Sequence, residues 1–259
     1  MTTFSSGNPQ PAPGVPASPD SERTARLCAE TALFMRDHVL SVVSHDLRSP
    51  LNAIHSWAYV LERKLEATDA TAERAIVGIR NGVEQQVKLL ETIVDATRAE
   101  TKALTLARVP FALRPLVDAT VAEVRAALAD SRGVTIAVNS TPADQTFSGD
   151  TERLAQVLWL MLTFAVEASA REASITLESA VDGTTWHTTV TFAPTPAAFG
   201  DATLPHLLEA FARQQAREPR EAGRIAWVLA LCKRIAEAHG GKFEQNDVSL
   251  VLRVPLAAA

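Results

Sequence analysis

Apolar residues recur every seven positions along residues 21–66, and this spacing predicts one long helix. The first stripe consists of Leu33, Leu40, Leu47, Ile54 and Leu61, and a second line beside it consists of Leu51, Ala58 and Leu65. After the polar turn EATDAT, a second helix is predicted to about Ala103, with an apolar side formed by Ile76, Ile79, Val83, Val87, Leu90 and Val94. Sustained heptad spacing is typical of helices that pack lengthwise. A lone hairpin has little core, so we expect two chains to form a dimeric four-helix bundle.

The rest of the chain alternates between helical and extended patterns after a connector, LTLARVPFALRPLV, that contains two prolines. Helices are predicted over 115–129, 150–169, 204–213 and 223–238, and strands over 134–139, 173–181, 184–194, 242–246 and 249–256. Asp182-Gly183 and Asn246-Asp247 are typical of hairpin turns. We therefore expect an α+β fold in which the helical hairpin precedes an α/β sandwich, with helices on one face of a mixed or antiparallel sheet.

Composition narrows the class of protein. The 259 residues are 47% hydrophobic and 21% charged, as in a soluble globular protein, and the net charge of -5 gives no general attraction to nucleic acid or to an anionic membrane. No apolar run is long enough to span a bilayer, and no basic segment precedes an apolar one at the N-terminus, so we expect a cytoplasmic protein without a signal peptide. Residues 1–20, rich in Pro, Ser and Gly, are predicted to be disordered. Cys28 and Cys232 lack metal-ligand spacing and fit a reducing compartment.

The segment SHDLRSPLNAI places a histidine and a proline within the first helix. Leu47 lies two residues after His45, or about 200° around the axis, so His45 points away from the heptad stripe and into solvent. Pro50 cannot donate to the carbonyl of Asp46, so we expect the helix to bend or loosen there. Geometry alone leaves two alternatives open, a plain surface histidine or an exposed imidazole nucleophile oriented by the neighbouring carboxylate.

The same segment resembles the phosphoacceptor box of bacterial sensor histidine kinases, H-[ED]-L-R-T-P-L. The resemblance implies that His45 is the phosphorylated residue and that Asp46 is the adjacent acid that assists transfer. Arg48 matches the arginine of the box. Ser49 stands where the family has Thr or Asn, which positions a water during dephosphorylation, so phosphatase activity is in doubt. His38 and His55 lie outside the motif position, and we interpret them as surface or interface residues.

The resemblance extends to the second half of the chain, which corresponds to the ATP-binding domain of the family. The residues at the positions that contact nucleotide in the family are, however, different here. The segment GDTERLAQVLWLMLTFAVEASA is similar to the kinase helix D-x-x-R-L-x-Q-V-L-x-N-L-L-x-N-A, with its two asparagine positions on Leu160 and Phe164. In the family the second asparagine holds the magnesium ion between the ATP phosphates. A phenyl ring offers no oxygen ligand to a hard cation. The lysine that follows in many members is Glu167 here.

Two further nucleotide-binding motifs of the family are also altered in this sequence. The aspartate that would hold adenine corresponds to Ala193, and the nearby glycines correspond to Thr195 and Ala197. In the last glycine box, Ala226 and Val228 occupy positions where Cβ atoms obstruct a phosphate approaching the backbone. We therefore expect neither a nucleotide cofactor nor a metal site.

These observations lead to three hypotheses for a chain with a hairpin over 21–104 and a degenerate sandwich over 113–259. The favoured one is a homodimeric histidine phosphotransferase, which exchanges a phosphoryl group between His45 and an aspartate in the receiver domain of a response regulator. The second is an autophosphorylating histidine kinase with a divergent ATP pocket. The third is a non-enzymatic pseudokinase scaffold that binds a regulator or a kinase.

Overall fold

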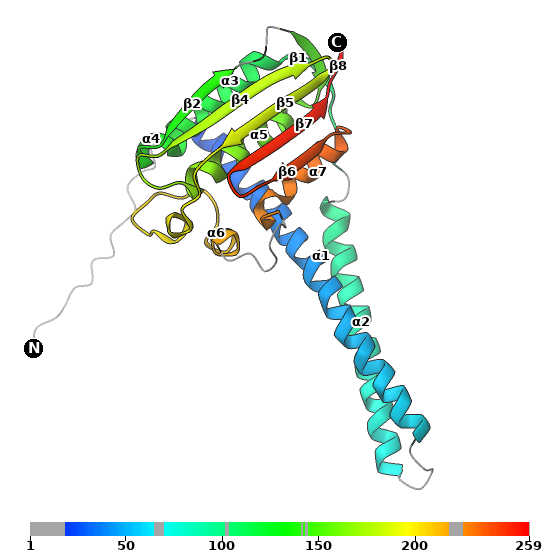
Figure 1. The fold of residues 1–259 in the computed structure, drawn as a ribbon. Coiled ribbons are helices and arrows are strands. Elements are labelled where there is room, and N and C mark those ends of the chain that lie inside the picture. The colour runs from blue at the N-terminus through cyan, green and yellow to red at the C-terminus, as the bar shows by residue number, and fades with distance from the viewer. Residues whose placement is uncertain are drawn as a thin grey trace, which may run out of the picture.

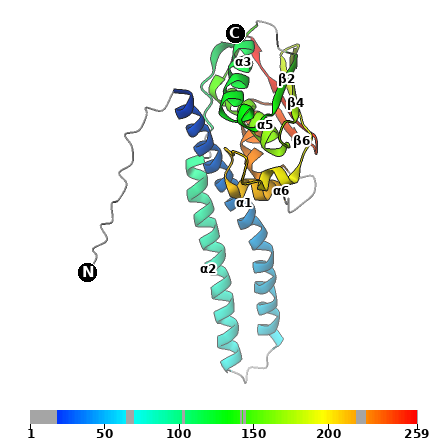
Figure 2. The same ribbon diagram turned by 90° about the vertical axis from the view of Figure 1, so that its left-hand side faces the viewer.

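The computed structural model describes residues 19–64, 70–101, 104–140, 142, 145–217 and 225–258. Residues 1–18, which the sequence predicts to be disordered, lie outside the described residues. The first helix, α1 (Pro19–Lys64), begins two residues before the predicted start. With α2 (Ala70–Thr101) it forms the predicted hairpin, which projects from an α/β part (Figures 1 and 2).

The α/β part is built on a five-stranded mixed sheet. Its strands, in spatial order, are β2 (Thr135–Ser140), β4 (Ser174–Asp182), β5 (Thr185–Thr191), β7 (Ser249–Pro255) and β6 (Lys242–Gln245). The β2–β4 pair is parallel and the other pairs are antiparallel. Helices α3 (Leu113–Val124), α5 (Thr151–Ala168) and α7 (Ala230–Ala238) cover one face (Figure 2). The predicted α+β architecture is therefore confirmed.

Successive side chains along each strand point to opposite faces of the sheet, and those on the helix-covered face form the core. Leu177, Trp186, Val190 and Leu252 point inward and are almost fully buried, and Trp186 Nε1 donates a hydrogen bond of 2.9 Å to Ser179 Oγ. Helix α5 is buried along nearly its whole length, because it lies between the sheet and a further helical layer. Such burial explains why its sequence is apolar on all sides.

Some predicted elements need correction. The connector contains β1 (Val109–Ala112), which pairs with β3 (Thr146–Gly149), and β3 in turn pairs with β8 (Ala257–Ala258) in a small antiparallel sheet. These strands are too short to show alternation, so no sequence pattern indicates them. Helix α6 (Ala210–Arg217) begins six residues later than the predicted helix 204–213. The predicted helix 223–238 is a 3₁₀ turn (Trp227–Leu229) followed by α7, and residues 223–224 lie outside the described residues.

Other short elements complete the α/β part. A π-helical turn (Arg125–Ala129) joins α3 to α4 (Asp130–Arg132), so the predicted helix 115–129 is nearly right in extent. A 3₁₀ turn (Pro196–Gly200) follows β5. Both predicted hairpin turns are confirmed, the first with Gly183 in the left-handed region at φ 59° and the second with Asn246 N–H bonded to the carbonyl of Ser249.

The first half of α1 forms an additional layer against the helices of the α/β part (Figures 1 and 2). Leu27 and Met35 are buried and belong to the same core cluster as α5 and α7. Around them, Arg153 of α5 donates to Glu30 at 2.7 Å, and Arg234 of α7 pairs with Asp37 at 3.3 Å. Helix α1 is therefore shared, with one half packed on the α/β part and the other half on α2.

The two apolar lines on the hairpin have different surroundings. In the second line, Ala58 is buried and Leu51 half-buried, while on α2 Ile76 and Val83 are buried; these residues close the hairpin. The first stripe, from Leu33 to Leu61, is exposed on the single chain. Ile79, predicted on the packed side of α2, is exposed as well. The side chains of Leu65 and Val94 lie outside the described residues.

The packing of α1 on the α/β part predicts a large effect of truncating Met35, whose side chain is 2% exposed. Met35→Ala should lower the free energy of unfolding of the α/β part by about 2–5 kcal/mol, because it leaves a cavity between α1 and its neighbours. Urea denaturation followed by the fluorescence of Trp159, Trp186 and Trp227 measures this. Glu22→Ala, on the exposed side of α1, is the control and should change stability by less than about 0.5 kcal/mol. Equal effects would mean that α1 does not pack there.

Candidate functional site

His45 lies on α1 just beyond the part of the helix that packs on the α/β part. Its side chain is 85% exposed. Helix α1 is continuous through Pro50. Exposure of His45 agrees with its predicted position off the apolar stripe. An imidazole in this setting can be approached from solvent by a second macromolecule.

Asp46 lies beside the ring and orients it. Nδ1 of His45 is 3.4 Å from Oδ1 of Asp46, at the long end of hydrogen-bonding distance. A carboxylate at Nδ1 favours the tautomer that carries its proton there, which leaves the lone pair on Nε2. The nitrogen left free is thus the one farther from the helix, where a reacting group can reach it.

Arg48 and Ser49 follow within one helical turn. Arg48 reaches across the hairpin, and its terminal nitrogen is 3.6 Å from Oε1 of Glu91 on α2. Ser49 is exposed. The four residues of the predicted motif therefore share one stretch of α1, and Glu91 is a neighbour that the motif did not reveal. Only the pairing of two predicted antiparallel helices could have suggested it.

The two other histidines of α1, predicted to be surface or interface residues, lie at contacts within the chain. His38 is half-buried against α7, and burial, together with Lys233 and Arg234, lowers its pKa although Asp37 opposes this. His55 faces α2, where Nε2 is 3.5 Å from Glu84. Neither shares the exposure of His45.

Aromatic rings occupy the position where the family resemblance expects a magnesium-binding asparagine. Phe164 on α5 is 3% exposed and packs edge-on against Phe192, with ring centroids 6.1 Å apart. Its ring centroid is 5.4 Å from that of Phe199, which lies in the 3₁₀ turn after β5. The three rings fill this region with carbon, and none supplies an oxygen ligand.

The other two altered boxes also lack the contacts that the family resemblance expects. Ala226 and Val228 are buried. The Ala226 N–H donates to the side-chain oxygen of Gln245 at 2.7 Å, and the Trp227 N–H donates to that of Gln215 at 2.9 Å. These backbone donors are thus occupied by the chain itself. Ala193 and Ala197, at the adenine-binding box, are exposed and offer no side-chain acceptor.

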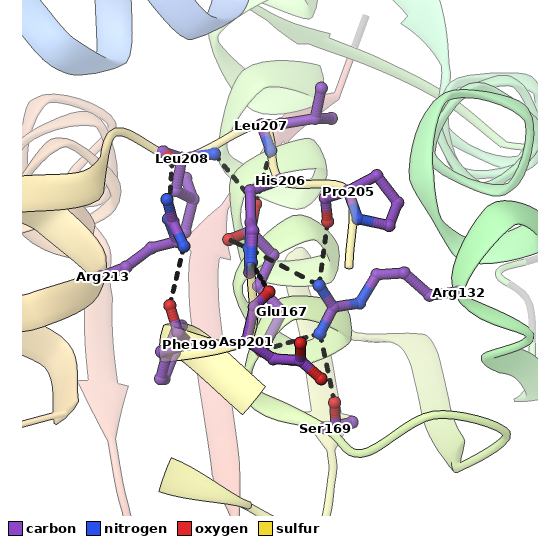
Figure 3. A network of polar contacts seen from close by, with 10 residues as sticks. All are labelled: Arg132, Glu167, Ser169, Phe199, Asp201, Pro205, His206, Leu207, Leu208 and Arg213. Carbon is purple, nitrogen blue, oxygen red and sulfur yellow. Dashed lines mark hydrogen bonds and ion pairs between the residues drawn. The ribbon is translucent and has the colours of Figure 1, made fainter. Parts of the chain in front are cut away.

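Glu167 fastens the segment between the 3₁₀ turn and α6 onto the end of α5 (Figure 3). Its carboxylate is fully buried and accepts the N–H groups of Leu207 and Leu208 at 2.7 and 2.9 Å. The same carboxylate is 2.8 Å from Nδ1 of His206. The charge reversal at Glu167 is visible in the sequence, but its partners lie about forty residues away, and no spacing indicates them.

Arg132 completes this network from the end of α4 (Figure 3). The side chain is almost fully buried and donates to the carbonyls of Pro205, Glu167 and Ser169. Burial lowers its pKa, while Glu167 and Asp201 oppose that shift. An arginine remains charged well above neutral pH even so. The segment 201–208 is therefore held at both its backbone and its side chains.

The residues present do not fit ATP and magnesium as the family binds them. The magnesium position carries Phe164, the glycine-box amides of Ala226 and Trp227 donate to Gln245 and Gln215, and Glu167 places a carboxylate where many members have a lysine. The magnesium ligand, the free glycine-box amides and the adenine acceptor, whose position carries Ala193, are thus missing together. Among the described residues, His45 is thus exposed, while a phenyl ring and occupied backbone donors stand at the positions that the resemblance assigns to magnesium and to the glycine box.

Comparison with known proteins relates both halves of the chain to one family. Residues 35–102 match the model of the His Kinase A (phospho-acceptor) domain. A crystal structure of a histidine kinase from Burkholderia phymatum STM815 is 56% identical, with a TM-score of 0.72, and the match covers 92% of this chain and 99% of that one.

Curated relatives give weaker but consistent matches. The signal transduction histidine-protein kinase BaeS of Escherichia coli is 26% identical over 86% of this chain and 47% of that protein. The sensor protein TorS of the same species is 27% identical over 92% of this chain and 26% of that protein. The chain thus spans less than half the length of these relatives. No helix among the described residues is long and apolar enough to cross a membrane.

The Glu167 network predicts a strong effect of removing its carboxylate. Glu167→Ala should lower the free energy of unfolding by about 3 kcal/mol, because two backbone N–H groups and His206 lose their acceptor in a buried place. Thermal denaturation of the α/β part measures this. Glu178→Ala, an exposed carboxylate on β4, is the matched control and should have little effect. A Glu167→Ala protein as stable as the control would show that the network does not hold the segment.

Proposed function

The chain belongs to the sensor histidine kinase family, and we propose that it acts in two-component signalling by carrying a phosphoryl group on Nε2 of His45. The observation that carries this proposal is the exposed His45 beside Asp46, within the segment that matches the phosphoacceptor domain. Asp46 holds the proton on Nδ1 and stabilises the positive charge that the ring gains during attack. The partner is the receiver domain of a response regulator, which takes the phosphoryl group on an aspartate.

Two sources of the phosphoryl group are supported by different observations. The relatives named above are called histidine kinases, and this favours loading from ATP, which makes autophosphorylation the candidate that the comparisons support better. The packing of Phe164 against Phe192 and Phe199 favours the other source, an aspartyl phosphate on a response regulator. Exchange with an aspartyl phosphate needs little from this chain beyond an aligned imidazole, because the receiver domain brings its own Mg²⁺.

Labelling experiments separate the two sources. The protein is incubated with γ-³²P-labelled ATP and Mg²⁺, and separately with a ³²P-phosphorylated receiver domain of a candidate regulator, and acid-labile label on the protein is counted. Label from the receiver domain alone would establish exchange, and label from ATP would establish a kinase with an unusual pocket. Label from neither source would overturn the proposal and leave a non-enzymatic scaffold.

His45→Gln should abolish labelling from either source, because glutamine cannot accept the phosphoryl group. His55→Gln, on the same helix, is the matched control and should be labelled like the unaltered protein. Persistent label in His45→Gln would show that another residue is the acceptor.

We also propose that the chain acts as a homodimer. The exposed first stripe of α1, which includes Leu47 and Ile54, provides an apolar surface along the hairpin, and pairing with a second copy would bury it in a four-helix bundle. The matched phosphoacceptor domain supports this arrangement.

The dimer proposal predicts that Leu47→Glu combined with Ile54→Glu yields monomers, because four carboxylates would meet in the bundle core. Light scattering coupled to size-exclusion chromatography measures the mass. Val248→Glu is the control, since Val248 is equally exposed but lies on the turn between β6 and β7. A dimer that survives the double substitution would place the interface elsewhere.

A further inference from the structure

Arg48 lies three residues after His45 on α1 and is held only loosely by its partner on α2. Its terminal nitrogen is 3.6 Å from the Glu91 carboxylate, which is beyond the usual length of a hydrogen bond. Its Nε is buried and has no hydrogen-bond partner in the described part of the chain. The guanidinium is thus attracted to Glu91 while part of its donor capacity is unused.

The helix brings Arg48 within reach of the acceptor. His45 and Arg48 are three residues apart on α1, and such side chains are neighbours, with Cβ atoms roughly 5–6 Å apart. The extended arginine side chain can cover that separation. Its planar fork of N–H donors matches the oxygens of a phosphoryl group.

Phosphorylation changes the charge around Arg48. A phosphoryl group brings roughly two negative charges and three acceptor oxygens. The neighbouring carboxylates of Asp46 and Glu91 repel it, and both are about half exposed. A phosphoryl group therefore competes with Glu91 for the same cation, and it offers more charge and better-placed acceptors.

We propose that Arg48 is a phosphoryl-binding residue that exchanges Glu91 for the phosphoryl group when His45 is loaded. The inference rests on the proposed function, since it requires phosphorylated His45. In the unloaded protein Glu91 keeps the guanidinium beside α2. In the loaded protein Arg48 leaves α2, neutralises part of the new charge and stabilises the phosphorylated form. The contact between the two helices close to His45 is thereby loosened.

An exchange with a small donor tests this without ATP or a regulator. N-phosphoimidazole is equilibrated with the full chain: its P–N bond breaks, a P–Nε2 bond forms on His45, and the departing imidazole takes the proton that Nδ1 gives up. Because the broken and formed bonds are of one kind, the equilibrium constant reports the surroundings of the phosphoryl group. It is read from ³¹P NMR intensities of the two phosphorylated species.

Arg48→Gln should lower this equilibrium constant roughly tenfold, because the phosphorylated form loses a charge-assisted contact. Arg48→Lys should recover part of the loss, since it keeps the charge without the fork. Glu91→Gln should raise the constant, because it removes the competitor and a repelling charge. Opposite directions for Arg48→Gln and Glu91→Gln cannot come from the mere loss of a stabilising ion pair, which would affect both variants alike.

Other outcomes overturn the inference in distinguishable ways. If His45 is phosphorylated in every variant with the same constant, Arg48 does not bind the phosphoryl group and only this inference falls. If both variants lower the constant together with the melting temperature, the ion pair is structural. If the unaltered protein and His45→Gln give the same ³¹P spectrum, His45 takes no phosphoryl group, and the proposed function falls with the inference.

Discussion

The packing of α1 against the helical layer of the α/β part is the interaction on which the rest of the structure depends. Buried Leu27 and Met35 supply the apolar contact, and ion pairs of Glu30 with Arg153 and of Asp37 with Arg234 fix its register. Because α1 is one continuous helix, this contact also sets where His45 lies. His45 stands just beyond the last turns that are held, and its side chain is exposed.

The α/β part is tied together internally, whereas His45 on α1 is exposed. Glu167 and Arg132 hold segment 201–208 down, and Phe164 packs between Phe192 and Phe199. These interactions stabilise the α/β part, and the backbone donors of Leu207 and Leu208 are satisfied within it. Around His45, the carboxylate of Asp46 lies beside the ring, and Arg48 reaches from α1 toward Glu91 on α2. The α/β part thus fixes the first half of α1 and, through this continuous helix, the position of His45.

Much of the fold and part of the site could be predicted from the sequence. The heptad spacing predicted the hairpin, alternation predicted the five strands of the main sheet, and helix geometry predicted that His45 is exposed. The prediction was wrong for the start of α6 and silent on β1 and β3. Those strands are four residues each, and such short segments are ordered by their partners rather than by their own pattern.

The sequence by itself determined the helical hairpin, the α+β class and the exposure of His45, because each depends on residues within a few turns of one another. Tertiary structure alone decided that α1 packs on the α/β part and that Glu167 ties down Leu207 and Leu208. These contacts join residues 123 and 40 positions apart in the chain. They follow from how whole elements pack, and local periodicity carries no information about that packing.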